Sequence, residues 1–102
     1  MEIQFTDNYL ELLANNQTDT GKQKFSEEVI KSYRKKVFQI KHSKSTQELR
    51  KIKSLHFEKL KEKRYQGKYS IRLNEGYRMI FGIDKQGGVE IILIEEISDH
   101  YS

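Results

Sequence analysis

The spacing of apolar residues changes once along the chain, and this change constrains the fold more than any other feature. Between residues 26 and 42, apolar side chains recur near the helical period, with lysines and arginines between them. After residue 68 the period becomes two, in three runs: Tyr69, Ile71 and Leu73; Tyr77, Met79, Phe81 and Ile83; and Val89, Ile91 and Leu93. This order predicts an α+β fold in which N-terminal helices pack on a C-terminal antiparallel β-meander.

Two serines are expected to begin the helices, because a serine hydroxyl can accept hydrogen bonds from the free backbone donors of a first helical turn. Ser26 precedes the longer apolar pattern. Ser45 and Glu48 have the spacing of a capping box, so a second helix should begin there and end near Leu55 or His56.

The two ends of the chain carry weaker signals. Residues 2–5 alternate as a short strand might, residues 9–13 gather leucines on a helical turn, and residues 15–24 read as a polar loop. The last alternating run also has Ile92 and Ile94 on its other face. We therefore expect that strand to be covered on both sides, as a central strand is.

The register of the first strand pair follows from parity. Leu73 and Tyr77 must share the apolar face, which leaves residues 74–76 as the loop and sets Arg72 directly opposite Arg78. Like charges in that position destabilise a strand pair unless they are solvated or an anion compensates them. The pair is therefore either two splayed, solvated guanidinium groups or a preformed phosphate clamp.

Length and composition limit the classes of protein. A chain of 102 residues fits one domain spanning 1–102, and the absence of cysteine excludes disulfides and thiolate metal sites. The N-terminus has no basic stretch followed by an apolar run, and the longest apolar run contains Glu90, so we expect neither a signal peptide nor a membrane span. These features are compatible with a cytoplasmic protein.

Positive charge is concentrated in the middle of the chain. The net charge is +4, but the segment from Lys31 to Arg78 holds 16 lysines and arginines against 4 glutamates, a local charge of +12. Such a block attracts polyanions, which favours a nucleic acid or an acidic protein partner. The alternative is an ordinary solvated helix face.

A family resemblance enters through the basic segment and the hairpin that follows it. Its residues are Leu60-Lys61, Arg64, Gly67, Tyr69-Ser70-Ile71-Arg72-Leu73-Asn74, Tyr77-Arg78 and Phe81. This string, which covers about the last 45 residues, resembles the RelE/ParE toxin superfamily and most closely its HigB-type members. The resemblance implies a toxin of a type II toxin-antitoxin pair, with helices followed by a curved antiparallel sheet. Many such toxins cleave messenger RNA on the ribosome.

The resemblance also implies roles for particular residues. Arg78 matches the arginine that stabilises transition-state charge, and Arg72 matches a sheet arginine that holds RNA. Four basic residues near the hairpin are the expected RNA contacts: Lys59, Lys61, Arg64 and Lys68. The ending His100-Tyr101 resembles that of YoeB-type toxins, with Tyr101 stacking on a base or donating its hydroxyl to phosphate.

Two departures from HigB-type sequences stand out in the basic segment. Glu62 stands where those sequences usually have glycine, and the loop that leads to Ser70 is one residue longer. Glu62, Lys59 and Lys61 are the candidates for a second acid or base, beside the main proton carrier.

His100 is the expected proton carrier, because an imidazole exchanges protons near neutral pH. A turn after Glu96 would fold it back towards Arg78. No metal or other cofactor is expected, since His42 and His56 lack the spacing of metal ligands, and alternating strand faces should separate Glu95 from Glu96.

Three functions remain open on the sequence. The leading one is a metal-independent endoribonuclease that cuts messenger RNA in the ribosomal A site and is neutralised by a cognate antitoxin. A ParE-like inhibitor of DNA gyrase is the first alternative. The second is a non-catalytic RNA-binding or ribosome-binding module, which the +12 segment alone would support.

Overall fold

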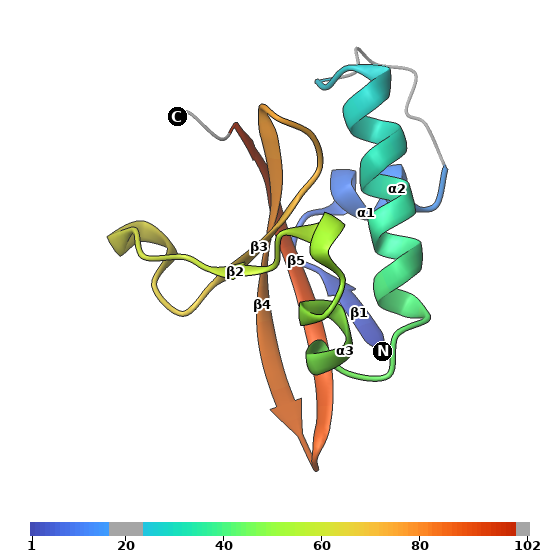
Figure 1. Ribbon diagram of the computed structural model, residues 1–102. Coiled ribbons are helices and arrows are strands. Elements are labelled where there is room, and N and C mark those ends of the chain that lie inside the picture. The colour runs from blue at the N-terminus through green and yellow to red at the C-terminus, as the bar shows by residue number, and fades with distance from the viewer. Residues whose placement is uncertain (17–23, 100–102) are drawn as a thin grey trace.

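A five-stranded sheet with helices against one face organises the chain (Figure 1). The computed structural model describes residues 1–16 and 24–99. Its elements are β1 (Glu2–Phe5), α1 (Asn8–Ala14), α2 (Glu27–Lys41), α3 (Thr46–Arg50), the 3-10 turn η1 (Lys53–Leu55), β2 (Glu58–Lys59), the 3-10 turn η2 (Lys63–Tyr65), β3 (Tyr69–Arg72), β4 (Tyr77–Gln86) and β5 (Val89–Asp99). The predicted α+β class is confirmed.

Both predicted helix starts are confirmed by their caps. The Ser26 hydroxyl accepts a hydrogen bond from the Val29 backbone at 3.3 Å, and the Ser45 hydroxyl accepts one from the Glu48 backbone at 3.3 Å. The Glu48 carboxylate accepts from the Lys44 backbone, one residue before the cap. Each helix therefore begins where a side chain satisfies its first free donors.

The second helix is shorter than predicted, because α3 ends at Arg50 and not near residue 55. Ile52 is extended, and the separate turn η1 follows and closes at His56, which adopts a left-handed backbone with φ 48° and ψ 51°. The break lets Leu49 and Leu55 both reach the core, where each is 0% exposed. Tertiary packing thus overrides the helical pattern here.

The sheet order β1-β5-β4-β3-β2 contains the predicted meander and extends it at both edges. β3, β4 and β5 are antiparallel, as expected, and β2 adds a two-residue antiparallel strand beside β3. β1 pairs parallel with β5, so the sheet is mixed and not wholly antiparallel. β5 therefore lies inside the sheet, which confirms its predicted central place.

The main core fills the space between the sheet and the helices. Tyr33 of α2 is 0% exposed and donates its hydroxyl to the Leu10 carbonyl of α1 at 2.8 Å, and burial raises the pKa of this phenol above its usual value. On the opposite face of the sheet, Leu60, Tyr65 and Ile80 form a second, smaller core. That core attaches the segment 60–68 to the sheet.

A β-bulge in β5 changes which face its acidic residues use. Ile80 lies opposite Glu96 whereas Phe81 lies opposite Ile94, so Glu95 is the additional residue. A Cβ atom placed on Gly82 would lie on the same sheet face as Ile80, and it would be 3.1 Å from a carboxylate oxygen of Glu95. The prediction that alternation separates Glu95 from Glu96 is therefore wrong, because a bulge breaks the parity of the strand.

The predicted turn after Glu96 is also wrong. β5 continues to Asp99, with Ser98 opposite Arg78 and Asp99 opposite Tyr77. His100 and Tyr101 lie outside the described residues.

Within the parts of the chain that the structure describes, no helix is long and apolar enough to cross a membrane.

Candidate active site

Arg72 and Arg78 lie directly opposite each other on β3 and β4, which confirms the predicted register. Both lie on the sheet face away from the main core, since their neighbours Ile71 and Met79 form the pair that packs into it. The two arginines differ in burial. Arg72 is exposed, whereas Arg78 is only 8% exposed.

Arg78 has unusually few partners for a buried cation. Its Nη2 atom lies 3.5 Å from a carboxylate oxygen of Glu62, and its guanidinium carbon lies 5.6 Å from the centre of the Tyr65 ring. Its Nε atom is buried with no hydrogen-bond partner among the described residues. Buried arginines normally have their donors paired, so Arg78 retains an unsatisfied donor at Nε.

The Tyr65 ring is itself held in place. Its hydroxyl donates to both carboxylate oxygens of Glu96, at 3.1 Å and 3.0 Å, and its ring packs against Leu60 and Ile80. The guanidinium carbon of Arg64 lies 4.7 Å from the centre of the same ring. Tyr65 therefore contacts both Glu96, in the bulged part of β5, and the guanidinium group of Arg78.

A small cavity of about 50 Å³ adjoins the two arginines. Its walls come from η1, β2, β3 and the β3–β4 hairpin: His56, Glu58, Ser70, Arg72, Asn74, Tyr77 and Arg78. The Asn74 side chain accepts hydrogen bonds from the Gly76 and Tyr77 backbones at 2.9 Å and 2.8 Å, which fixes the hairpin loop.

An imidazole lies beside the exposed arginine. The Nε2 atom of His56 is 3.5 Å from an Nη atom of Arg72. The left-handed backbone of His56 is uncommon for a residue with a side chain, and such conformations gather at functional sites. The cavity therefore brings together two guanidinium groups, one imidazole and the Glu58 carboxylate.

The predicted RNA contacts are only partly brought together. Lys59 lies opposite Tyr69, whose side chain packs with the main core, so Lys59 is on the face away from Arg78. The Lys68 ammonium forms an ion pair with Glu95. Lys61 and Arg64 are exposed on the segment 60–68, which crosses the face of the sheet that carries Arg78.

Sequence reasoning missed four residues around Arg78. His56 and Glu58 line its cavity, Tyr65 lies against its guanidinium group, and Ser70 is the buried residue two positions from Arg72. Only Ser70 had a local signal, because it shares the parity of Arg72 on β3. The others reach the site through irregular segments that periodicity does not describe.

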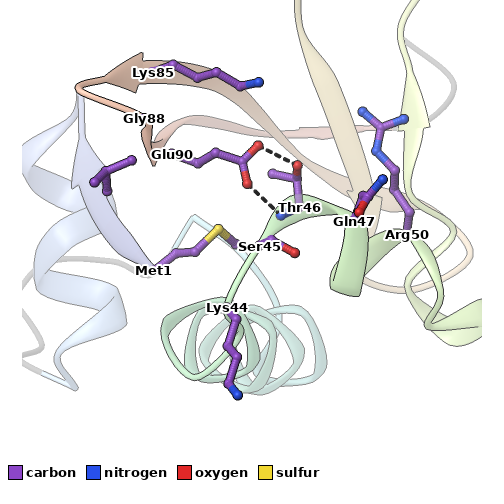
Figure 2. A pocket seen from close by; sticks show the side chains of 10 residues that line it. Met1, Lys44, Ser45, Thr46, Gln47, Arg50, Lys85, Gly88 and Glu90 are labelled. Carbon is purple, nitrogen blue, oxygen red and sulfur yellow. Dashed lines mark hydrogen bonds between the residues drawn. The ribbon is translucent and has the colours of Figure 1, made fainter.

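A second, larger cavity of about 710 Å³ lies between α3 and the β4–β5 hairpin (Figure 2). Figure 2 shows the Glu90 side chain reaching from β5 to the start of α3, where its oxygens accept from the Thr46 backbone at 2.9 Å and the Thr46 hydroxyl at 2.6 Å. The hydrogen bond from the Thr46 hydroxyl lowers the pKa of Glu90.

No group of three or more acidic or histidine residues that could hold a metal ion occurs within residues 1–16 and 24–99.

Comparison with solved structures finds the same fold in two toxins. A YoeB/ParE toxin from Agrobacterium tumefaciens matches with a TM-score of 0.60 at 15% identity, over 99% of this chain and 100% of that one. The YoeB-YefM complex from Staphylococcus aureus matches with a TM-score of 0.53 at 21% identity, over 99% of this chain and 98% of the other. At these identities the likeness concerns the fold alone.

Comparison with curated proteins gives no match. A family model, however, matches residues 3–93 and describes the RelE-like toxin HigB of type II toxin-antitoxin systems. The match includes the N-terminal helices, which lie outside the string of residues that carries the resemblance. The chain therefore belongs to the HigB-like toxin family, the RelE-like toxins of type II toxin-antitoxin systems.

Proposed function

We propose that this toxin cleaves messenger RNA in the ribosomal A site without a metal ion, in the cytoplasm, and that Arg78 stabilises the charge that develops on the phosphate. The observation that carries the proposal is the buried guanidinium group of Arg78, whose Nε atom has no partner among the described residues. A fixed, desolvated donor stabilises developing charge more strongly than a solvated one. Arg72, opposite it, would hold the RNA backbone.

The proposed reaction uses the 2′-hydroxyl of the RNA as the nucleophile. Its oxygen attacks the adjacent phosphorus while a base takes its proton. The bond to the 5′ oxygen of the next nucleotide then breaks, and that oxygen receives a proton. The products are a 2′,3′-cyclic phosphate and a free 5′-hydroxyl. Because the nucleophile is internal and already positioned, the entropic part of the activation barrier is lowered without any bound cofactor.

Three groups are candidates for the proton transfers. His56 and Glu58 line the cavity next to the arginines, and an imidazole or a carboxylate can act as the base. His100, which lies outside the described residues, stays a proposal from the sequence. Tyr101 is proposed to contact the base or the phosphate beside it.

An antitoxin is the proposed protein partner. The neighbouring structure from Staphylococcus aureus is a complex of YoeB with YefM. In this chain, the +12 segment would speed the encounter with an acidic or amphipathic segment of the antitoxin. It would also favour a complex in which that segment covers the basic sheet face. An antitoxin interface confined to residues 1–30 would contradict this.

The test compares Arg78→Ala with Arg50→Ala, which removes the same charge from α3. Both variants are induced in bacteria at matched expression, and RNA cleavage is followed with intact ribosomes. We expect Arg78→Ala to relieve growth arrest and reduce cleavage about 100-fold to 1,000-fold, whereas Arg50→Ala stays toxic. A 2′-methoxy group at the cut site should block cleavage and leave binding intact.

One result would favour the other functions, and another would contradict the proposed mechanism. Growth arrest that persists in Arg78→Ala, with uncut messenger RNA, would point to gyrase inhibition or to pure RNA binding. Cleavage of the 2′-methoxy RNA would contradict the proposed nucleophile. Cleavage should also persist when free divalent ions are chelated, in an assay that keeps the ribosomes assembled.

A further inference from the structure

We propose that Glu62 occupies the anion position of Arg78 in the free toxin, and that the RNA phosphate must displace Glu62 to reach this arginine. The inference rests on the proposed function for the identity of the incoming anion. It makes Glu62 a residue that tunes RNA affinity. Three features of the site support it.

The first feature is the geometry of the ion pair. The Nη2 atom of Arg78 and the nearest oxygen of Glu62 are 3.5 Å apart, longer than the roughly 2.7–2.9 Å of a strong charge-assisted bond. The Glu62 side chain is 48% exposed, while that of Arg78 is 9% exposed. The carboxylate therefore covers the arginine from the solvent side through a weak contact.

The second feature is that Arg78 is fixed without Glu62. The Tyr65 ring lies beside the guanidinium group, and the Tyr65 hydroxyl is bound to Glu96. The backbone of Arg78 is held in the sheet between its register partners, Arg72 on β3 and Ser98 on β5. When Glu62 leaves, the guanidinium group remains in position for a second anion.

The third feature is the surplus hydrogen-bonding capacity of Arg78. Its Nε atom is buried without a partner among the described residues, so a single carboxylate contact at Nη2 leaves a donor unused. A phosphate presents more acceptor oxygens than Glu62 delivers here and suits the fork of Nε and Nη donors. Exchange of Glu62 for phosphate would therefore satisfy an atom that the free protein leaves unsatisfied.

Competition by Glu62 should lower the apparent affinity for RNA, because only molecules with the carboxylate displaced can bind. We would measure binding of a 2′-methoxy RNA oligonucleotide, which is not cut, to the wild type, Glu62→Gln and Glu75→Gln. Glu75 is an exposed residue of the 74–76 loop, so Glu75→Gln removes the same charge from the same basic segment.

We expect Glu62→Gln to bind about fivefold more tightly than the wild type, the upper range for a partly exposed ion pair. Glu75→Gln should change affinity less than about twofold, since exposed charges are screened by salt. Equal effects of the two substitutions, or weaker binding by Glu62→Gln, would overturn the inference.

A second readout does not depend on RNA. The Nε–H signal of Arg78 can be followed by nuclear magnetic resonance while inorganic pyrophosphate is added, with Arg78→Lys used to assign the signal. The signal should shift at lower pyrophosphate concentration in Glu62→Gln than in the wild type. If it does so while RNA is neither bound nor cut, the displacement stands and the proposed function fails. An Nε–H signal that is insensitive to pyrophosphate in both proteins would overturn the displacement.

Discussion

At the scale of single residues, the site is built around one buried arginine whose neighbours come from distant parts of the chain. Tyr65 belongs to η2, and Glu96 belongs to the bulged part of β5. Their hydrogen bond joins the segment 60–68 to the sheet at the point where Arg78 lies. We therefore propose Tyr65 as a positioning residue that acts through the guanidinium group of Arg78.

This role predicts different effects for two substitutions of Tyr65. Tyr65→Phe keeps the ring beside Arg78 and loses the bond to Glu96, so we expect about 1 kcal/mol less stability and nearly normal cleavage. Tyr65→Leu also loses the cation–π contact, so the turnover rate on RNA should fall while the Michaelis constant changes little. Thermal unfolding and cleavage kinetics check both. If Tyr65 had a purely structural role, both folded variants would turn over RNA at the wild-type rate.

The histidines give a second prediction at this scale. If His56 carries a proton in the reaction, His56→Gln should reduce cleavage about 100-fold or more and leave binding of 2′-methoxy RNA unchanged. His42→Gln is the matched control, because His42 is an exposed residue at the end of α2. His100→Gln tests the proton carrier that the sequence suggests. Normal cleavage by His56→Gln, with loss only in His100→Gln, would remove His56 from the mechanism.

The arginine pair was predictable from sequence, and most of its surroundings were not. Strand parity across a short loop determines that Arg72 and Arg78 are opposite each other, because alternation is a local property. His56 depends on a left-handed residue after a 3-10 turn, and Tyr65 on a loop that folds over the sheet. Neither feature has a repeating pattern, so the sequence could not place these side chains.

At the scale of elements, α3 is anchored to the sheet by one carboxylate. Glu90 of β5 accepts hydrogen bonds from the backbone and the hydroxyl of Thr46, the first residue of α3 (Figure 2). These bonds, led by the one from the hydroxyl, lower the pKa of Glu90 from its usual 4.5. The short helix has only five residues and would not be stable by itself.

The lowered pKa has a defined consequence for stability. The folded protein favours the ionised carboxylate of Glu90. The stabilisation that this carboxylate contributes to the folded state is therefore complete above pH 4.5 and is lost as the pH falls through the folded pKa. We expect Glu90→Gln to unfold about 1 kcal/mol more easily at pH 7. The difference from the wild type should shrink as the pH falls below 4.5. Urea unfolding across this range measures it, with Glu11→Gln on α1 as the control. A difference independent of pH would contradict this account.

The elements also show where periodicity stops being informative. The caps at Ser26 and Ser45 and the three meander strands were predicted because each depends on neighbouring residues. The parallel pairing of β1 with β5 joins residues some 90 positions apart, and no local pattern encodes it. The bulge at Glu95 reverses the parity of β5, which is why the faces of Glu95 and Glu96 were predicted wrongly.

At the scale of the whole molecule, the fold divides the +12 segment between two sides of the sheet. Its first part forms α2, which lies on the side opposite to the segment of β2 and η2 (Figure 1). On the arginine side, Glu95 pairs with Lys68, and Lys59 lies on the other face. The positive charge on the arginine side of the sheet is therefore much smaller than the sequence total implies.

This division predicts the salt dependence of RNA binding. Five cationic side chains belong to the segments around Arg78: Lys61, Lys63, Arg64, Arg72 and Arg78. Each phosphate neutralised on a single strand contributes about −0.7 to the slope of log affinity against log salt, so five contacts give about −3.5. If all 16 cations of the segment bound RNA, the slope would be about −11.

Titration of 2′-methoxy RNA from low to physiological salt separates these two cases, and two variants locate the contacts. Lys63→Ala should make the slope about 0.7 less steep, because it removes one phosphate contact from the arginine side. Lys35→Ala removes an equal charge from the exposed face of α2, and it should leave the slope unchanged because that helix packs on the other side of the sheet. The two variants have the same net charge, so they differ only in where the charge lies. A slope near −11, or an equal response to the two substitutions, would mean that RNA follows the whole basic segment. In that case the arginine pair would be one contact among many.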